Sequence, residues 1–255
     1  MITGQLIVGV SIAVAASLLG VFAILKRMSL VGDALSHVAL PGIALALFFK
    51  INPFVGALAI LLLAVIGIWF LEYRSQLSVD TIVGVFFTAS LALGALFIPE
   101  FELLEALFGD ISQVSNFDVI LSVIFSLFLI IVLIAVHKKL ALHMVSQEMA
   151  YSAGVRPKTL EFIYLMLFAL GVALGIRFVG ALLMGALIII PAAAAKNVAK
   201  SLQGFMVLSS LFGAVSAVSG IYLAQIFHSA PGPIFILAGS VIFIISLGWR
   251  ILVKR

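Results

Sequence analysis

The chain contains no cysteine in its 255 residues. That absence excludes disulfide bonds, thiolate metal ligands, iron–sulfur clusters and cysteine nucleophiles. Charged residues are also scarce, at 9% of the chain, against about 25% in an ordinary soluble domain. Apolar residues make up 65%, and the mean hydropathy is +1.38. So apolar a surface needs lipid around it, and the composition therefore predicts a polytopic membrane protein.

Several catalytic motifs are missing as well. No Gly-Lys dipeptide occurs, so the chain has no P-loop for nucleotide hydrolysis. Neither His-Glu-x-x-His nor Gly-x-Ser-x-Gly occurs, which removes the patterns of zinc proteases and serine hydrolases. The first apolar run starts without a basic segment and ends without a small-residue cleavage pattern, so no cleaved signal peptide is predicted. We expect a membrane protein that is not itself an enzyme.

Nine apolar runs approach the length of a membrane-spanning helix, which needs about 20 residues at about 1.5 Å each. The two runs on either side of Arg177 are short enough to form one broken unit, so eight spans are the alternative. No soluble domain interrupts the pattern. The sequence therefore predicts an all-α, polytopic transmembrane helix bundle in a single domain, residues 1–255. The nine runs are residues 5–25, 35–49, 54–71, 81–98, 119–136, 160–176, 178–195, 205–227 and 234–249.

Basic residues are distributed unequally between the two sides of this bundle. If the first span runs from outside to inside, twelve of the fourteen Lys and Arg residues lie in inner loops, and only Lys50 and Arg177 lie outside. The positive-inside rule favours that orientation, so we expect an outer N-terminus and an inner C-terminus, and no nucleic-acid partner is needed to explain the basic residues. The outer loop after the fourth span is either a solvated loop or a docking face for an external partner. Its acidic residues are Glu100, Glu102, Glu105 and Asp110.

Ionisable side chains within an apolar span are rare, because each costs at least about 2.5–3.5 kcal/mol on insertion scales. Asp33 and His37 stand at the start of the second span, four residues apart. Four residues turn a helix by about 400°, which brings both side chains onto one face with a rise of about 6 Å. A carboxylate and an imidazole without thiolate suit zinc, manganese or iron(II). We expect Asp33 and His37 to be metal ligands; an Asp–His hydrogen bond or a helix cap is the structural alternative.

Two donors are too few for a tight metal site. A twofold dimer with this face at its axis would supply two Asp and two His side chains, enough for a four-coordinate shell. The same span contains Pro41 and Gly42. Proline removes a backbone hydrogen bond and bends a helix, and broken helices recur at the ion sites of transporters. The sequence therefore predicts a site that two copies of the chain share on a bent helix.

The remaining candidates for metal binding are weaker. Asp80 opens the fourth span, where a helix-capping role is an alternative. His228 lies in an outer turn with Pro and Gly, where it is either a surface residue or a receiver of the ion. His137 and His143 flank a Lys-Lys pair, and we expect them to belong to the basic inner surface.

The longest inner loop, residues 138–158, contains a short helical pattern. Ser146 begins the pattern, Gly154 ends it and Pro157 stops it. We expect a short amphipathic helix at the cytosolic surface. It is either a plain interfacial helix or a socket for a motor subunit, which the chain needs if it moves a solute against a gradient.

Five segments of the chain carry a resemblance to a known family. They are Arg27-Met-Ser-Leu-Val-Gly-Asp-Ala-Leu-Ser-His-Val-Ala-Leu-Pro-Gly42, Asp80-Thr81 with Gly84, Gln147-Glu-Met-Ala-Tyr-Ser-Ala-Gly154, Phe178-Val-Gly-Ala-Leu and Ile190-Pro-Ala-Ala-Ala194. With these motifs the sequence resembles the membrane permease subunits of bacterial ABC importers for manganese, zinc and iron. The first motif is the specific one, and the resemblance covers nearly the whole chain.

The resemblance implies a fold like that of the cobalamin-type importer permeases and a homodimer in the cytoplasmic membrane of a bacterium or archaeon. It further implies two cytosolic ABC ATPase subunits and an extracytoplasmic metal-binding protein as partners. In this chain it puts Asp33 and His37 on the metal path. It also implies a coupling helix for the ATPase at Glu148, Ala150 and Gly154.

The expected function is ATP-driven import of a divalent metal ion by alternating access. Zinc, manganese and iron all fit the donor set, and the family likeness favours zinc slightly. The ion is cargo, and no permanently bound cofactor is expected. A proton-coupled secondary metal transporter, with Asp33 and His37 as a proton relay, is the alternative.

Overall fold

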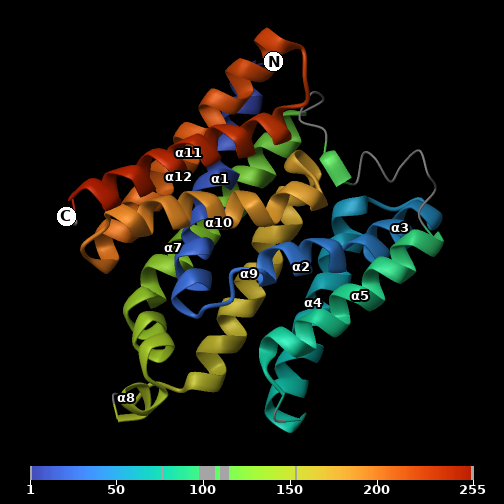
Figure 1. The fold of residues 1–255 in the computed structure, drawn as a ribbon. Helices are drawn as coiled ribbons and strands as arrows, with labels where there is room; N and C mark the ends of the chain where they lie inside the picture. Colours follow the sequence, from blue (N-terminus) through green and yellow to red (C-terminus); the bar gives the residue numbers. More distant parts are fainter. Residues whose placement is uncertain (1, 76, 98–106, 110–114, 153, 254–255) are drawn as a thin grey trace.

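The computed structural model describes residues 2–75, 77–97, 107–109, 115–152 and 154–253. These residues form α-helices joined by short turns, and they include no strand (Figure 1). The outer-loop acids Glu100, Glu102, Glu105 and Asp110 lie outside the described residues. The helices are α1 (Ile2–Leu25), α2 (Val31–Val38), α3 (Leu40–Phe48), α4 (Pro53–Ser75), α5 (Val79–Phe97), α7 (Asn116–Val145), α8 (Gln147–Ser152), α9 (Pro157–Val179), α10 (Ala181–Val198), α11 (Leu202–Phe227) and α12 (Pro231–Val253).

Within the described residues, nine segments are long and apolar enough to cross a membrane. This confirms the all-α bundle and favours nine spans over eight. The two runs near Arg177 form separate spans, because the chain turns between α9 and α10 at Gly180, whose φ is +87°. A Cβ on Gly180 would lie 2.1 Å from the Leu107 carbonyl oxygen, so the turn needs glycine both for its left-handed backbone and for this close approach.

The second span consists of two helices. α2 ends at Val38 and α3 begins at Leu40, with Pro41 in the first turn of α3. Pro41 has no N–H to donate to the preceding turn, which explains why the helix is interrupted there. Gly42 has a packing role, because a Cβ on it would lie 2.3 Å from the Gly56 carbonyl oxygen of α4. The interruption therefore lies next to the point where α3 and α4 pack backbone against backbone.

The centre of the bundle is built around α1 and α10. α1 packs against α7, α9, α10 and α11, and α10 also packs against α2 and α12. Accordingly 78% of the spanning window of α1 is buried in the chain, against 11% of that of α12. The exposed apolar faces of the outer helices are the surfaces that lipid or another subunit must cover.

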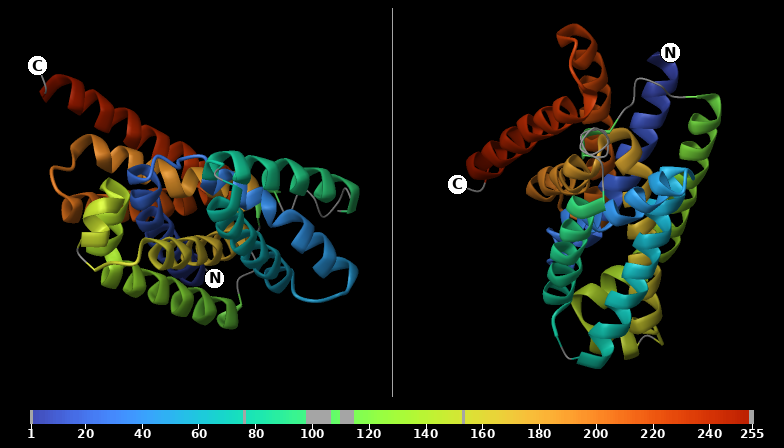
Figure 2. Two further views of the ribbon diagram at one scale, coloured as in Figure 1. Left: turned by 90° about the horizontal axis from the view of Figure 1, so that it is seen from below. Right: turned by 90° about the vertical axis from the view of Figure 1, so that its right-hand side faces the viewer.

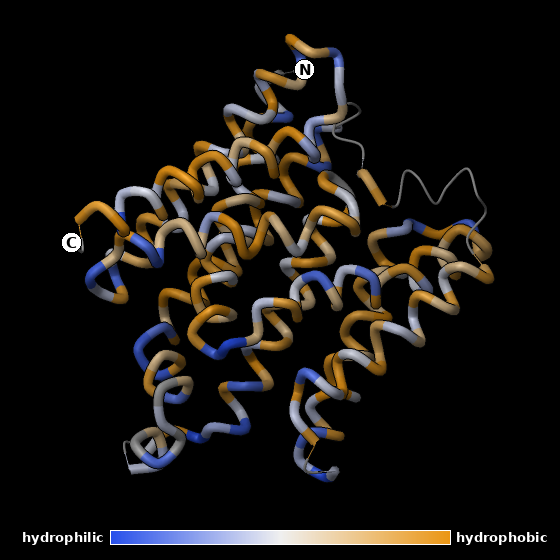
Figure 3. Tube along the Cα trace, in the orientation of Figure 1, coloured by the Kyte–Doolittle hydropathy of each residue, from blue (hydrophilic) through white to orange (hydrophobic). Residues whose placement is uncertain are grey.

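α8 and the turn between α4 and α5 lie at the same end of the molecule (Figures 1 and 2). Figure 3 shows polar residues concentrated at this end, while the helices above it are mostly apolar. α4 packs on α9, and α5 packs on α2 and α3, so these helices form one side of the bundle, away from α12 (Figure 2, right). The chain thus has a polar end that carries α8 and an apolar body that carries α2.

Candidate functional site

Asp33 and His37 lie one turn apart on α2, as their spacing predicts. Leu30 occupies the N-cap position of this helix, and Asp33 lies in the first helical turn. The alternative that Asp33 caps the helix is therefore wrong. A carboxylate in the first turn is still favourable, because it faces the positive end of the helix dipole.

The His37 ring is held by a backbone hydrogen bond. Its Nδ1 lies 2.9 Å from the carbonyl oxygen of Asp33. A carbonyl can only accept, so Nδ1 is the donor, and in the neutral imidazole Nε2 is then the nitrogen that keeps its lone pair. His37 is 8% exposed, and its ring stands edge-on to Phe87 of α5, with 5.3 Å between the ring centroids. Metal-binding histidines are commonly oriented in this way, with the other ring nitrogen donating to a backbone carbonyl.

The Asp33 carboxylate is not used in that hydrogen bond. Among the described residues, none forms a hydrogen bond or an ion pair with it. α2 is positioned there by a close contact with α10, where a Cβ on Gly185 would lie 2.6 Å from the Asp33 Cα. The site therefore presents a carboxylate and an imidazole Nε2 from a helix that is firmly seated on the core.

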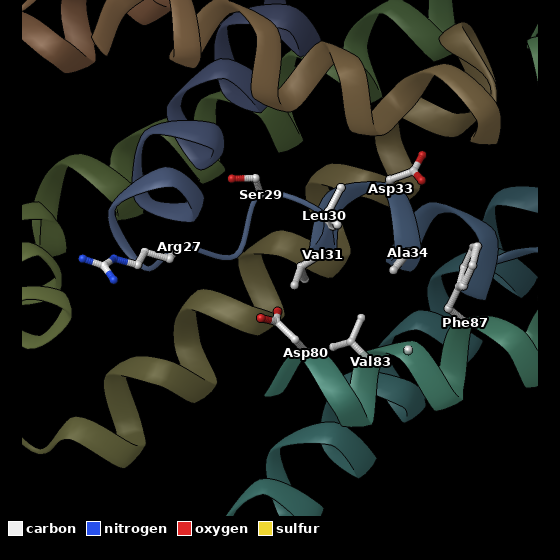
Figure 4. Close-up of a pocket in the computed structure, with 10 residues that line it drawn as sticks. Arg27, Ser29, Leu30, Val31, Asp33, Ala34, Asp80, Val83 and Phe87 are labelled. Carbon is white, nitrogen blue, oxygen red and sulfur yellow. The ribbon is translucent and has the colours of Figure 1, made fainter. Parts of the chain in front are cut away.

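A cavity of about 530 Å³ lies beside this site, between α2 and the start of α5. Asp33 and Asp80 both line it, from different helices, but their carboxylates do not point at each other (Figure 4). Within the described part of the chain, no group of three or more His, Cys, Asp or Glu residues could hold a metal ion. One chain therefore offers two donors at α2. The lining residues are Arg27, Ser29, Leu30, Val31, Asp33, Ala34, Asp80, Val83, Gly84 and Phe87.

Asp80 is an exposed residue in the first turn of α5. The cap of this helix is Ser78, whose Oγ accepts a hydrogen bond from the Thr81 N–H at 3.3 Å and lies 2.8 Å from the Thr81 hydroxyl. The alternative that Asp80 caps this helix is therefore wrong. Its carboxylate is available on the cavity wall that faces α2.

His228 lies elsewhere in the fold. It is exposed and ends α11 in the left-handed conformation, with φ +50° and ψ +41°. The described residues that line the cavity come from α2, the turn before it and α5, so the structure does not bring His228 together with Asp33 and His37 at this cavity.

The short helix predicted in the inner loop is α8. The loop itself is shorter than residues 138–158, because α7 continues to Val145 and Pro157 is the first residue of α9 rather than only a stop. α8 ends in a Schellman motif: the Val155 N–H donates to the Ala150 carbonyl and the Gly154 N–H donates to that of Tyr151, both at 3.0 Å. Gly154 has φ +70°, as that motif requires.

The two faces of α8 differ. Glu148 and Tyr151 are exposed, and Ala150 is fully buried. Ala150 therefore anchors the helix to the bundle, while Glu148 and Gly154 lie on the accessible side. Among the described side chains of α8, the apolar Ala150 is buried and Glu148 is exposed, as the predicted amphipathic helix requires.

A second charged cluster lies near α8, and it was not predicted from the sequence. Glu161 in α9 is 3% exposed and forms an ion pair with Lys26, which follows α1. It also accepts a hydrogen bond of 2.9 Å from the Tyr73 hydroxyl, and the His143 Nε2 lies 3.9 Å away. His143 is 5% exposed, so its expected place on the basic surface is wrong. Glu161 is the only acid in the apolar run 160–176, and that signal could have identified it.

The model of the ABC 3 transport family matches residues 1–250 of the chain. The manganese transport system membrane protein MntC of Listeria monocytogenes is 34% identical over 245 residues, which cover 94% of this chain and 88% of that protein. The high-affinity zinc uptake system membrane protein ZnuB of Haemophilus influenzae is 32% identical over 247 residues, which cover 95% of each.

Solved structures have the same fold. The chain is similar to PsaBC of Streptococcus pneumoniae, solved with a Fab, with a TM-score of 0.85, 31% identity and coverage of 96% of this chain and 90% of that one. An inward-facing metal-chelate type ABC transporter matches with a TM-score of 0.81 over 96% of this chain and 85% of that one, at 17% identity, which supports the fold alone. Together with the matched family model, these likenesses establish that the chain is a multi-pass membrane protein of the ABC 3 transport family.

Proposed function

We propose that this chain is the permease subunit of an ATP-driven importer and that it moves zinc or manganese across the cytoplasmic membrane. The observation that carries the proposal is the pair on α2: a carboxylate without a partner among the described residues, and an imidazole whose Nε2 is left free by the backbone bond of Nδ1. The printed names of relatives give manganese and zinc as their cargo. Oxygen and imidazole donors suit both ions.

Two copies of the chain complete the site in this proposal. Each copy brings Asp33 and His37, so a twofold axis at α2 gives two oxygen and two nitrogen donors. That set fills a tetrahedral shell for zinc, while manganese would keep additional water ligands. The pair of chains then encloses the path, and the ion passes at the interface between them.

The route inward follows the cavity beside α2. Asp80 of α5 lines the same cavity as Asp33 of α2. In this proposal Asp80 is the second carboxylate that the ion meets, after it leaves Asp33. His228 at the end of α11 remains a candidate receiver at the outer mouth. The positive-inside rule places the N-terminus outside and the C-terminus inside in this arrangement.

The energy comes from partner subunits. Members of this family work with ATPase and substrate-binding partners. We propose that α8 docks a cytosolic ATPase through Glu148 and Gly154, while the buried Ala150 keeps the helix on the bundle. An extracytoplasmic metal-binding protein would deliver the ion to the outer face, and ATP binding and hydrolysis would switch the pair of chains between outward-open and inward-open states.

The test is metal uptake by proteoliposomes that contain the permease and its ATPase, supplied with the loaded binding protein. Uptake should require ATP and persist when the proton gradient is removed. Asp33→Ala and His37→Ala should abolish uptake. His137→Ala is the matched control, because His137 also bonds through Nδ1 to a backbone carbonyl but lies on α7. Uptake that continues without ATP and stops with the proton gradient would favour the secondary carrier instead.

A further inference from the structure

Four helices meet at Glu161 in the part of the chain that the structure describes. Glu161 lies in the first turns of α9, and Lys26 reaches it from the end of α1 as an ion pair. Tyr73 of α4 donates its hydroxyl to Oε2 at 2.9 Å, and His143 of α7 approaches the same oxygen at 3.9 Å. The side chain of Glu161 is 3% exposed and that of Lys26 is 18% exposed. A carboxylate this buried with this many partners has a defined position.

The cluster is not a second metal site. The Lys26 ammonium occupies the place where a cation would bind the carboxylate, and the described residues hold no group of three or more metal-binding side chains. Burial lowers the pKa of Lys26, while the carboxylates of Glu72 and Asp80 oppose that shift. Lys26 is therefore the cation that neutralises Glu161, and the cluster needs no metal ion.

Glu161 is close in the chain to α8. α8 ends at Ser152 and α9 begins at Pro157, and the other flank of α8 is α7, which carries His143. Both helices that flank α8 thus contribute to the cluster. Because α8 packs on both α7 and α9, a displacement of α8 can reach the ends of these helices that hold His143 and Glu161.

The partners of Glu161 lead to the two walls of the cavity. Lys26 is followed by a tight turn, in which Arg27 has φ +61° and the Met28 N–H donates to the Ala23 carbonyl at 2.9 Å, and α2 with Asp33 begins directly afterwards. Tyr73 lies near the end of α4, which connects through a short turn to α5 with Asp80. The α2 wall of the cavity is therefore connected to Glu161 through Lys26, and the α5 wall is connected to Glu161 through Tyr73.

A second set of contacts fixes α9 to α4 at the same level. The Trp69 Nε1–H donates to the Lys158 carbonyl at 3.2 Å, and the Lys158 ammonium lies 4.5 Å from the centroid of the Tyr73 ring. Trp69 also packs edge-on against Phe162, with 5.2 Å between the ring centroids. The start of α9 and the end of α4 should therefore move together.

We propose that the Lys26–Glu161–Tyr73 cluster, which we call the Glu161 joint, transmits the movement of α8 to both walls of the metal cavity. This inference rests on the proposed function, because it assumes that an ATPase acts on α8. Glu161, Lys26 and Tyr73 are positioning residues in this scheme: they do not touch the ion, and they act on it through α2 and α5. A buried, charge-assisted contact suits that task, because exposed ion pairs are weak and easily exchanged with water.

The experiment measures metal uptake and ATP hydrolysis in the same proteoliposomes of the full complex. Glu161→Gln and Lys26→Met each remove one side of the ion pair, and the double variant removes both. Lys139→Gln is the control, because Lys139 is an exposed lysine near the same end of α7. We expect the number of ions taken up per ATP hydrolysed to fall about tenfold in all three joint variants, within the range of allosteric coupling, and to stay unchanged in the control.

The double variant separates a joint from a purely structural ion pair. Each single variant removes one partner of the buried ion pair and should lower the melting temperature of the complex, whereas removal of both charges should restore most of the loss, short of the attraction between Lys26 and Glu72. If the cluster transmits movement, the double variant still lacks this connection although it is stable. The uptake per ATP of the double variant should therefore remain low. Recovery of both stability and uptake per ATP in the double variant would overturn the inference.

The two proposals fail in different ways. Asp33→Ala in the same vesicles tests the proposed function, and normal uptake by that variant would contradict the metal site at α2. Normal uptake per ATP by Glu161→Gln and by the double variant, together with loss of uptake in Asp33→Ala, would contradict the Glu161 joint alone.

Discussion

Asp33 and Glu161 are both carboxylates in helices that can cross a membrane, and their surroundings are opposite. Glu161 is 3% exposed and has a cation, a phenol and an imidazole around it. Asp33 is half-buried beside a cavity, and no described residue forms a hydrogen bond or ion pair with its carboxylate. The carboxylate of Glu161 is thus neutralised by a cation of the protein itself, whereas that of Asp33 has no such partner among the described residues. An ion can be bound only where the protein has not already supplied the cation.

The histidines repeat this contrast. His37 donates from Nδ1 to a backbone carbonyl, and no described residue forms a hydrogen bond with its Nε2. The Nε2 of His143 instead faces the Glu161 carboxylate at 3.9 Å. A histidine in an apolar helix is therefore informative about function only once the partner of each ring nitrogen is known.

The largest expected effect is on uptake. His37→Ala removes a proposed ligand and should lower the rate of metal uptake by roughly 100-fold or more, while leaving the melting temperature of the complex nearly unchanged. Uptake of radioactive zinc or manganese into proteoliposomes is the measurement. If His137→Ala lowers uptake as strongly as His37→Ala, the loss is not specific to His37, and the proposed role of His37 as a metal ligand is wrong.

The second prediction concerns stability. Glu161→Gln removes the ion-pair partner of Lys26, which then keeps only the weaker attraction of Glu72 and Asp80, and should cost about 3–5 kcal/mol of the free energy of unfolding. Asp33→Asn should change it by less than about 0.5 kcal/mol, because no bond to a described residue is lost. Unfolding of both purified variants in mixed detergent measures the difference. Equal destabilisation by the two variants would contradict the comparison.

A third prediction tests how firmly α2 is seated. Gly185→Ala puts a Cβ 2.6 Å from the Asp33 Cα, so α2 must shift away from α10. We expect a loss of about 1–3 kcal/mol in stability and weaker metal binding. Gly248→Ala on α12 is the matched control, since nothing lies within 4 Å of its added Cβ. Unchanged metal affinity in Gly185→Ala would show that the position of α2 does not set the site.

The smallest expected effect is at the end of α8. Gly154 has φ +70° and open space around its added Cβ, so Gly154→Ala costs only the left-handed backbone conformation, about 1–2 kcal/mol. Because that strain falls on the helix proposed to dock the ATPase, the affinity of the ATPase should weaken before metal binding does. Co-purification of the two subunits across a salt series measures it, and metal binding weakened to the same degree would contradict a local effect.

Much of the fold could be predicted from composition and run length. Lipid is the only solvent for a chain with 65% apolar residues, and membrane spans are recognised by their length, so the nine segments could be predicted. The proline in the second span pointed to the interruption between α2 and α3. The helix ends were less predictable. Ser78 rather than Asp80 caps α5, because capping depends on one residue of register that hydropathy does not encode.

The site was predictable where it depends on one helix. Asp33 and His37 follow from the four-residue spacing, since a helix of known period places both side chains. The Glu161 joint could not be derived in that way. It joins residues from helices far apart in sequence, and Lys26 and His143 resemble ordinary members of a basic inner surface until tertiary packing buries them.

The most direct test of the account is the stoichiometry of metal binding by the purified permease, measured by equilibrium dialysis with zinc and with manganese. The account predicts one tightly bound ion for each pair of chains, lost in Asp33→Ala and in His37→Ala and kept in His137→Ala. One ion bound to each single chain, or binding that survives His37→Ala, would contradict a site shared by two copies of α2.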